Sequence, residues 1–169
     1  MKRFLLILFL GLCLTTNIKA NCSDPLGDGV DYSNCLFSEK QNLNSSYLPN
    51  SNLSFTGFIK VIFDKSIMMN SILSYGNFPD SSFIRVNLYE SNLEGGIFEN
   101  TNFSGANLTR VNFKGSSLIG ANFTNSNLYE SDFTGANILN VNFEGANLNY
   151  VIWIDGEKCG LESVGECKK

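Results

Sequence analysis

The sequence of 169 residues contains no histidine, only three prolines and a single tryptophan. The absence of histidine excludes Ser-His-Asp and Cys-His catalysis and every metal site that needs an imidazole ligand. The five cysteines form no Cys-x-x-Cys motif, which argues against a redox motif or a zinc finger. With 17% charged and 43% hydrophobic residues, the chain is neither disordered nor a membrane protein of many spans. We expect a repeated architecture without catalytic activity, cofactor or metal.

The first twenty residues have the pattern of a secretory signal peptide. Lys2 and Arg3 precede the apolar segment from Phe4 to Leu14, and Ala20 supplies a small residue for cleavage. The apolar segment is too short to span a bilayer, although an uncleaved membrane anchor stays open as an alternative. We expect export to the periplasm, or to the thylakoid lumen in a cyanobacterium, with no membrane attachment after cleavage.

Cleavage after Ala20 changes both the charge and the cysteine count. Loss of Lys2, Arg3 and Lys19 takes the formal net charge from −4 to −7, which disfavours binding to nucleic acid. Cys13 is lost as well, so an even number of cysteines remains, and in an exported protein this favours disulfides. The four are Cys22, Cys35, Cys159 and Cys167, and they allow three pairings.

A period of five residues runs from Gln41 to Asp155. Every fifth position from Leu43 to Trp153 is large and apolar, without a slip in register. We number the places of each unit one to five: a small residue, then Asn or Asp, then the apolar residue, then two variable residues. An α-helix would place successive apolar side chains 140° apart, and a strand would alternate its faces. A chain that turns a corner every five residues would direct them all to one axis.

The units resemble those of the pentapeptide-repeat family, as in Ala106-Asn107-Leu108-Thr109-Arg110 and Ala121-Asn122-Phe123-Thr124-Asn125. The resemblance covers residues 41–155 and implies an all-β fold, a right-handed quadrilateral β-helix of about six coils. Residues twenty apart would then stack, and the series Phe63, Phe83, Phe103, Phe123 and Phe143 supports this independently. We expect residues 1–20 to be the signal peptide, 21–40 an N-terminal cap, 41–155 the β-helix and 156–169 a C-terminal cap.

The expected length of the rod restricts the disulfides. Coils about 4.8 Å apart give a rod on the order of 28 Å long, whereas bridged Cα atoms lie within about 7 Å of each other. Cysteines at opposite ends therefore cannot pair. Local disulfides Cys22–Cys35 and Cys159–Cys167 remain, one in each cap.

The second coil departs from the pattern. Isoleucine occupies the second place in three successive units, at Ile62, Ile67 and Ile72. Either these residues pack inward through a local irregularity, or they face outward and form an interface. The candidate interface residues are Ile59, Ile62, Ile67, Met69, Ile72 and Tyr75. If exposed, the isoleucines should be covered by the N-terminal segment around Leu36 and Phe37, by a second copy, or by another protein.

The sequence favours a non-catalytic, exported structural or protein-binding rod with an unknown protein partner or weak self-association. The resemblance also implies an alternative, a DNA-mimicking inhibitor of a topoisomerase, which would require a cytoplasmic location. The acidic residues do not form a continuous stripe in the expected coil, which disfavours this alternative.

Overall fold

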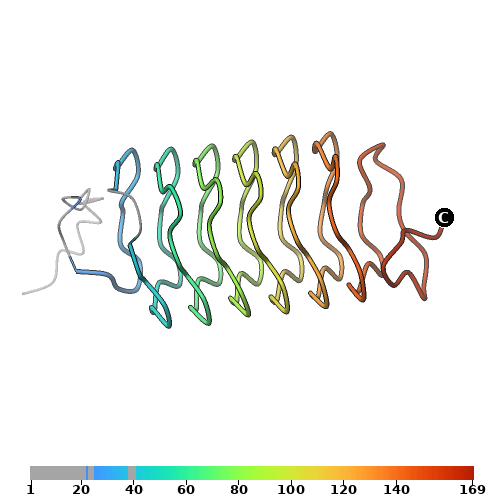
Figure 1. The fold of residues 1–169 in the computed structure, drawn as a ribbon, viewed down its shortest axis with the longest axis horizontal. Helices are drawn as coiled ribbons and strands as arrows, with labels where there is room; N and C mark the ends of the chain where they lie inside the picture. The colour runs from blue at the N-terminus through green and yellow to red at the C-terminus, as the bar shows by residue number, and fades with distance from the viewer. Residues whose placement is uncertain (1–21, 23–24, 38–40) are drawn as a thin grey trace, which may run out of the picture.

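The chain winds into a four-sided rod of stacked coils. The computed structural model describes residues 22, 25–37 and 41–169, which contain no α-helix and no strand longer than a single bridge residue per side. From Asn42 paired with Ile62 to Asp132 paired with Ile152, each second-place residue forms a parallel bridge with the residue twenty positions later. The coils follow one another along the rod from the N-terminal to the C-terminal end (Figure 1). The expected quadrilateral β-helix is therefore confirmed.

Backbone hydrogen bonds join each coil to the coils on both sides, as the unit 101–105 illustrates. The second-place amide of Asn102 donates to Ser81 O in the preceding coil at 2.9 Å, and the third-place amide of Phe103 donates to Asn122 O in the following coil at 2.7 Å. The fifth-place amide of Gly105 also donates to the following coil. Three of the five amides of such a unit thus belong to the inter-coil ladder.

The remaining two amides form the corner. The amide of Ala106 donates to Phe103 O at 3.1 Å and closes a β-turn, while the amide of Ser104 donates to the Oδ1 atom of Asn102 at 3.0 Å. The second-place asparagine therefore replaces a backbone acceptor at the corner, which is the structural role expected for this residue type. Its Nδ2 extends the arrangement between coils, as when Asn107 donates to Asn87 at 3.1 Å.

The fifth place has a positive φ in nearly every unit, whatever residue occupies it. Glycine accepts this conformation without cost at Gly105 (φ 65°), but Lys65 (φ 59°), Arg85 (φ 56°) and Tyr75 (φ 56°) adopt it too. L-residues with side chains are disfavoured there by about 1 kcal/mol. The inter-coil hydrogen bonds of the fifth-place amide hold these residues in the corner conformation.

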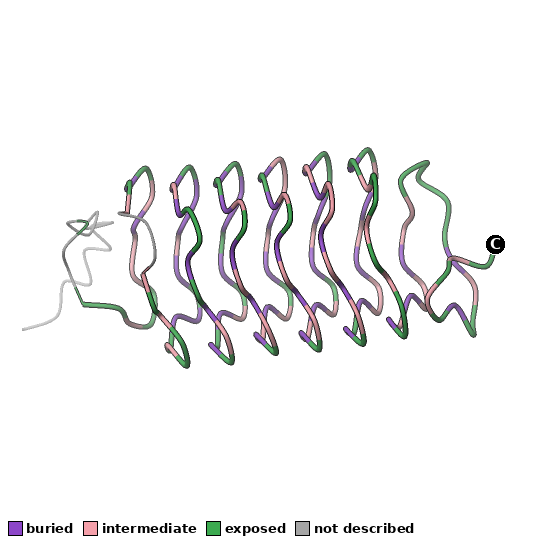
Figure 2. Ribbon diagram, in the orientation of Figure 1, coloured by how far each residue is buried: buried purple, intermediate pink, exposed green. Residues whose placement is uncertain are grey.

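The third-place side chains fill the axis of the rod. They are fully buried along most of its length, and buried residues recur along each coil (Figure 2). The rings of Phe83, Phe103 and Phe123 stack one above another, with centroids 5.1 and 5.0 Å apart. The residues at the two ends of the core, Leu43, Ile138, Phe143 and Trp153, are only partly buried.

The coil begins earlier than the regular repeat. Asp31 pairs with Asn52 and Leu36 with Gly57, so residues within the expected cap 21–40 already belong to the ladder. Their partners are 21 residues away rather than twenty, and the extra residue falls in the segment that contains residues 38–40, which lie outside the described residues. Phe37 continues the core by stacking on Phe58 at 4.2 Å. Because of this one-residue offset, the two additional units do not follow the constant five-residue register of residues 41–155.

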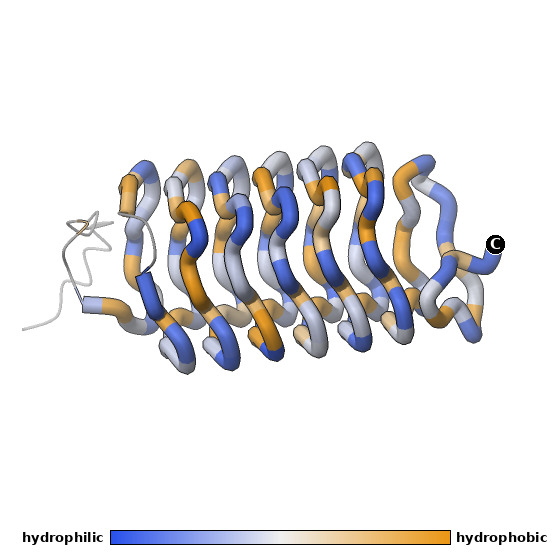
Figure 3. Tube along the Cα trace, in the orientation of Figure 1, coloured by the Kyte–Doolittle hydropathy of each residue, from blue (hydrophilic) through white to orange (hydrophobic). Residues whose placement is uncertain are grey.

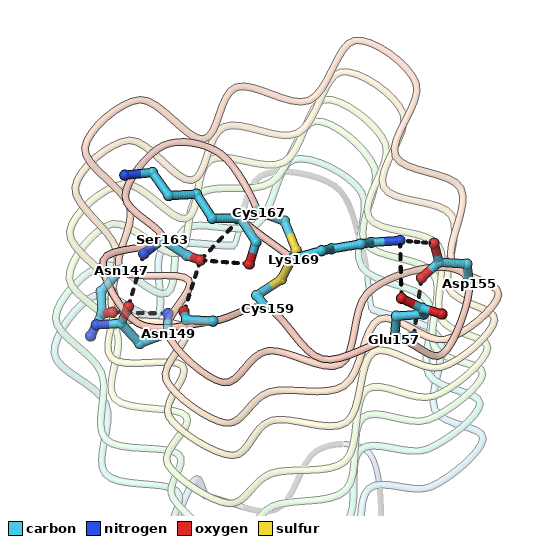
Figure 4. The surroundings of a disulfide bond; sticks show 10 residues. Asn147, Asn149, Asp155, Glu157, Cys159, Ser163, Cys167 and Lys169 are labelled. Carbon is cyan, nitrogen blue, oxygen red and sulfur yellow. Dashed lines mark hydrogen bonds and ion pairs between the residues drawn. A yellow bond between two sulfur atoms is a disulfide. The ribbon is translucent and has the colours of Figure 1, made fainter.

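The C-terminal tail turns back and covers part of the last coil. Val164 pairs antiparallel with Asn147, and the third-place amide of Leu148 donates to Ser163 O at 2.8 Å, so the tail supplies the acceptor that a further coil would have provided. The Cys159–Cys167 disulfide, with Cα atoms 5.2 Å apart, closes this tail (Figure 4). At the other end Cys22 is bonded to Cys35. Both disulfides are the local pairs expected from the sequence.

Removal of one stacked ring should destabilise the rod far more than removal of an outward side chain. We expect Phe123→Ala to lower the free energy of unfolding by about 3–5 kcal/mol because a cavity forms between the rings of Phe103 and Phe143. The control Glu144→Ala, which removes an exposed fourth-place side chain, should change it by less than about 0.5 kcal/mol. Urea denaturation of the oxidised protein measures both, and equal shifts would contradict the inward and outward assignments.

Candidate interaction surface

The three isoleucines of the second coil face outward. Ile62, Ile67 and Ile72 have exposed fractions of 37%, 39% and 43%, because Phe63, Met68 and Leu73 already fill the axis. The coil keeps the regular register of bridges, with Ile62 between Asn42 and Ser82. Hydrophilic, intermediate and hydrophobic residues recur along every coil of the rod (Figure 3). The alternative of an irregular coil with the isoleucines packed inward is therefore wrong.

These residues do not form one patch, however. Each isoleucine belongs to a different ladder and therefore lies on a different side of the rod. Ile59 is exposed and Met69 is half-buried, and both lie at corners rather than in the middle of a side. The structure separates Ile62 and Ile67 from Ile72, and only Ile72 lies next to the corner that carries Tyr75.

The structure brings together an apolar surface that the sequence analysis did not identify in full. Phe55 stacks on Tyr75 with ring centroids 5.2 Å apart, and both rings remain about half exposed, at 55% and 54%. Tyr75 in turn lies across Gly95, where a Cβ atom would be 2.5 Å from the ring. We call Phe55, Ile72 and Tyr75 the aromatic corner. The signal was present in the sequence, since Phe55 and Tyr75 share the fifth place twenty residues apart.

The described part of the N-terminal segment does not cover this surface. Phe37 is packed into the core against Phe58, and Leu36 lies over Gly57 while remaining 83% exposed. The isoleucines and the aromatic corner keep their exposure in its presence. The sequence analysis expected the N-terminal segment, a second copy or another protein to cover the isoleucines. The first of these is therefore excluded for residues 25–37.

Charged residues on another corner pair along the rod. Arg110 lies one coil from both Glu90 and Glu130; its Nη1 atom is 3.1 Å from Oε1 of Glu90, and its Nε atom is 2.8 Å from Oε2 of Glu130. A hydrogen bond from Tyr89, followed by one from Arg110, holds the pKa of Glu90 below its usual value. The hydrogen bond from Arg110 is the main cause of the lowered pKa of Glu130. This Glu–Arg–Glu ladder is solvent-exposed and has the arrangement expected of residues twenty apart.

Other acidic residues are also paired. Asp132 lies 3.0 Å from Lys114, and its pKa is lowered because hydrogen bonds from Thr134 and Lys114 together outweigh the effect of burial. Asp155 is paired with Lys169 in the C-terminal cap (Figure 4). No side of the rod therefore presents a continuous row of free carboxylates along the described residues.

The described residues contain no cluster of three or more His, Cys, Asp or Glu side chains able to hold a metal ion. The same residues include no helix of the length and hydropathy needed to cross a membrane. The interior is occupied by side chains, and a groove lies on the outer surface along one corner. Binding at an outer surface is the chemistry that this arrangement supports best.

Comparison with known proteins identifies the repeat. Residues 76–153 match the family model of the pentapeptide repeat region. Among solved structures, the chain is similar to QnrB1, a plasmid-mediated fluoroquinolone resistance protein, with 19% identity, a TM-score of 0.43 and coverage of 84% of this chain and 81% of that chain. It is also similar to a pentapeptide repeat protein from the cyanobacterium Cyanothece 51142, with 22% identity, a TM-score of 0.33 and coverage of 72% and 89%. A third is a pentapeptide repeat protein from the Arabidopsis thaliana thylakoid lumen, with 21% identity, a TM-score of 0.31 and coverage of 67% of each chain. No curated protein matches the chain.

Replacement of Arg110 should change the pKa values of Glu90 and Glu130 by different amounts. In Arg110→Gln we expect the pKa of Glu130 to rise to near its ordinary value, because Arg110 is the main cause of its depression. The pKa of Glu90 should rise less, because Tyr89 still donates to it. Carboxyl NMR titration measures both values.

The sign of the accompanying stability change follows from linkage. A carboxyl whose pKa is lower in the folded state contributes stability above its unfolded pKa and loses it as the pH falls through the folded pKa. Because the ladder is exposed, the thermal midpoint of Arg110→Gln should change little at neutral pH and even less in acid. An unchanged pKa of Glu130 would contradict the pairing.

Proposed function

We propose that this chain, whose residues 76–153 belong to the pentapeptide-repeat family, is a non-catalytic, exported rod that binds another polypeptide at the aromatic corner. The exposed stack of Phe55 on Tyr75 carries the proposal. Because the axis of the rod is already filled, these outward aromatic side chains do not contribute to the core. Large aromatic side chains that stay about half exposed are typical anchors of protein–protein contacts.

The surroundings of the aromatic corner favour close approach by a partner. Ile72 extends the apolar surface onto the adjacent side, and Gly115, one coil beyond the Gly95 that Tyr75 covers, leaves the same corner open. A partner chain seated there would contact ring and backbone together, with little steric hindrance. The candidate residues Ile59, Ile62, Ile67 and Met69 lie on other faces and would contribute only to a partner that wraps around the coil.

The two disulfides support an extracytoplasmic location, together with the signal peptide expected at residues 1–20. Disulfides persist in oxidising compartments such as the bacterial periplasm. The paired carboxylates disfavour the DNA-mimicking alternative, since Glu90, Glu130 and Asp132 each lie beside a cation instead of presenting free negative charge.

A photo-crosslinking amino acid at position 75 tests the surface in cells that export the protein. We expect one discrete adduct, whose mass distinguishes a second copy from another protein, and we expect Phe55→Asn to reduce its yield severalfold by removing the stacked ring. Asn is suitable because it tolerates the positive φ of this place. The control carries the same crosslinker at Leu139, an exposed apolar residue of another corner. Absence of an adduct at position 75, or the same adducts at both positions, would refute the surface.

Export has its own test, which is independent of the partner. Intact-mass analysis of protein recovered from the periplasm should show a chain that begins at Asn21 and lacks four hydrogens because both disulfides are formed. Retention of Met1, or free thiols at the four remaining cysteines, would contradict the proposed processing.

A further inference from the structure

A groove of about 320 Å³ runs along a different corner from the aromatic corner. It lies outside the stacked phenylalanines and spans four successive coils. Its lining contains two basic residues, one acidic residue, one isoleucine and four small or polar residues: Asp64, Lys65, Ile84, Arg85, Ser104, Gly105, Thr124 and Asn125. We propose that this groove binds a tetrahedral oxyanion, a phosphate or sulfate group, through Lys65 and Arg85.

The two basic residues are held next to each other by the backbone. Both occupy the fifth place, one coil apart, and the amide of Lys65 donates to Ile84 O at 2.8 Å. Adjacent coils are about 4.8 Å apart, so two positive charges start from neighbouring positions of one corner. Repulsion between them is relieved most effectively by an anion that both can contact.

Neither side chain has an anionic partner among the described residues, in contrast to Arg110, Lys114 and Lys169. The carboxylate of Asp64 also lines the groove and forms no ion pair with either residue; its Oδ1 accepts hydrogen bonds from Ser82 Oγ at 2.6 Å and from the amide of Ile84 at 3.0 Å. With Asp64 included, the groove keeps a net positive charge on a chain whose overall charge is negative.

Gly105 creates the space. A Cβ atom there would lie 3.3 Å from Cγ of Arg85, so the arginine stem lies across the bare backbone of the next coil. Arg85 and Ser104 both line the groove at this point. The planar fork of arginine matches two oxygens of a phosphate or sulfate group.

Further polar groups complete the groove. The hydroxyl of Ser104 has no hydrogen-bond partner within the described part of the chain and is available as a donor. Asn125 places its Oδ1 over Gly145, which leaves its Nδ2 as another donor at the far end. Thr124 contributes no donor, because its hydroxyl donates to Asn122 Oδ1.

The test is an NMR titration of the oxidised protein at low ionic strength with sodium phosphate, sodium sulfate, a phosphate monoester and a sugar sulfate, and with sodium chloride as reference. We expect saturable shifts of the amides of Lys65, Arg85, Ser104 and Gly105 with the oxyanions and none that saturate with chloride. Tighter binding of one ester than of the other identifies the natural source of the group. Absence of saturation, or shifts centred on other residues, would overturn the proposal.

Variants distinguish binding in this groove from nonspecific attraction of anions to positive charge on the protein. Arg85→Gln and Lys65→Gln should each weaken binding by about tenfold, as expected for loss of charge-assisted hydrogen bonds. The matched control Lys60→Gln removes an equal charge from a fifth place of another corner (φ 58°) and should change the affinity by less than about twofold. Equal effects of all three would refute the site.

A second variant tests the shape of the groove at constant charge. Gly105→Asn keeps the positive φ and fills the space beneath Arg85, so it should weaken oxyanion binding as strongly as Arg85→Gln does while the thermal midpoint stays close to that of the parent. Arg85→Lys should retain only part of the affinity, because the charge remains and the fork is lost. Undiminished binding in Gly105→Asn would show that the groove is not the binding site.

Discussion

The parallel ladder of backbone hydrogen bonds between coils is the constraint on which the rest of the structure depends. In a unit such as 101–105, amides of the second, third and fifth places bond to neighbouring coils, and those of the remaining two form the corner. Buried backbone donors must be paired, so a coil can stack only when its length matches that of its neighbours. Constant length in turn aligns the phenylalanines over one another. The filled interior leaves only the outer surface for binding.

The residues at the corners determine the shape of that surface. Because the fifth place has positive φ, glycine is the least strained residue there, yet several bulky ones occupy it. Where a bulky residue precedes a glycine by one coil, its side chain lies across the bare backbone, as Tyr75 does over Gly95 and Arg85 over Gly105. Both proposed surfaces arise from such pairs. A repeat that appears uniform in its core thus gains individual binding features from the order of residues in one column.

The two ends of the rod are stabilised differently from its middle. A solenoid exposes unpaired backbone and core at its termini unless other segments cover them. At the C-terminal end an antiparallel tail held by Cys159–Cys167 supplies acceptors to the last coil. At the N-terminal end the ladder continues to Asp31 with a one-residue offset. Disulfides at both ends restrict opening where the coils have fewest neighbours.

The sequence by itself determined the axis-filling residues, because a strict five-residue period leaves each place with one environment. The resemblance to the pentapeptide repeat implied the four-sided coil, and the expected length of the rod predicted both disulfide pairs. The sequence left open whether Ile62, Ile67 and Ile72 face inward or outward. It also placed Glu90, Arg110 and Glu130 in one column. Only the tertiary structure decided which outer residues are neighbours. It showed that Ile62, Ile67 and Ile72 face outward, joined Phe55 to Tyr75, and formed the groove at Lys65 and Arg85. The two N-terminal units also required the structure, because a single extra residue shifts their register. Contacts between side chains of adjacent coils depend on rotamers and on missing Cβ atoms, which a repeat pattern does not specify.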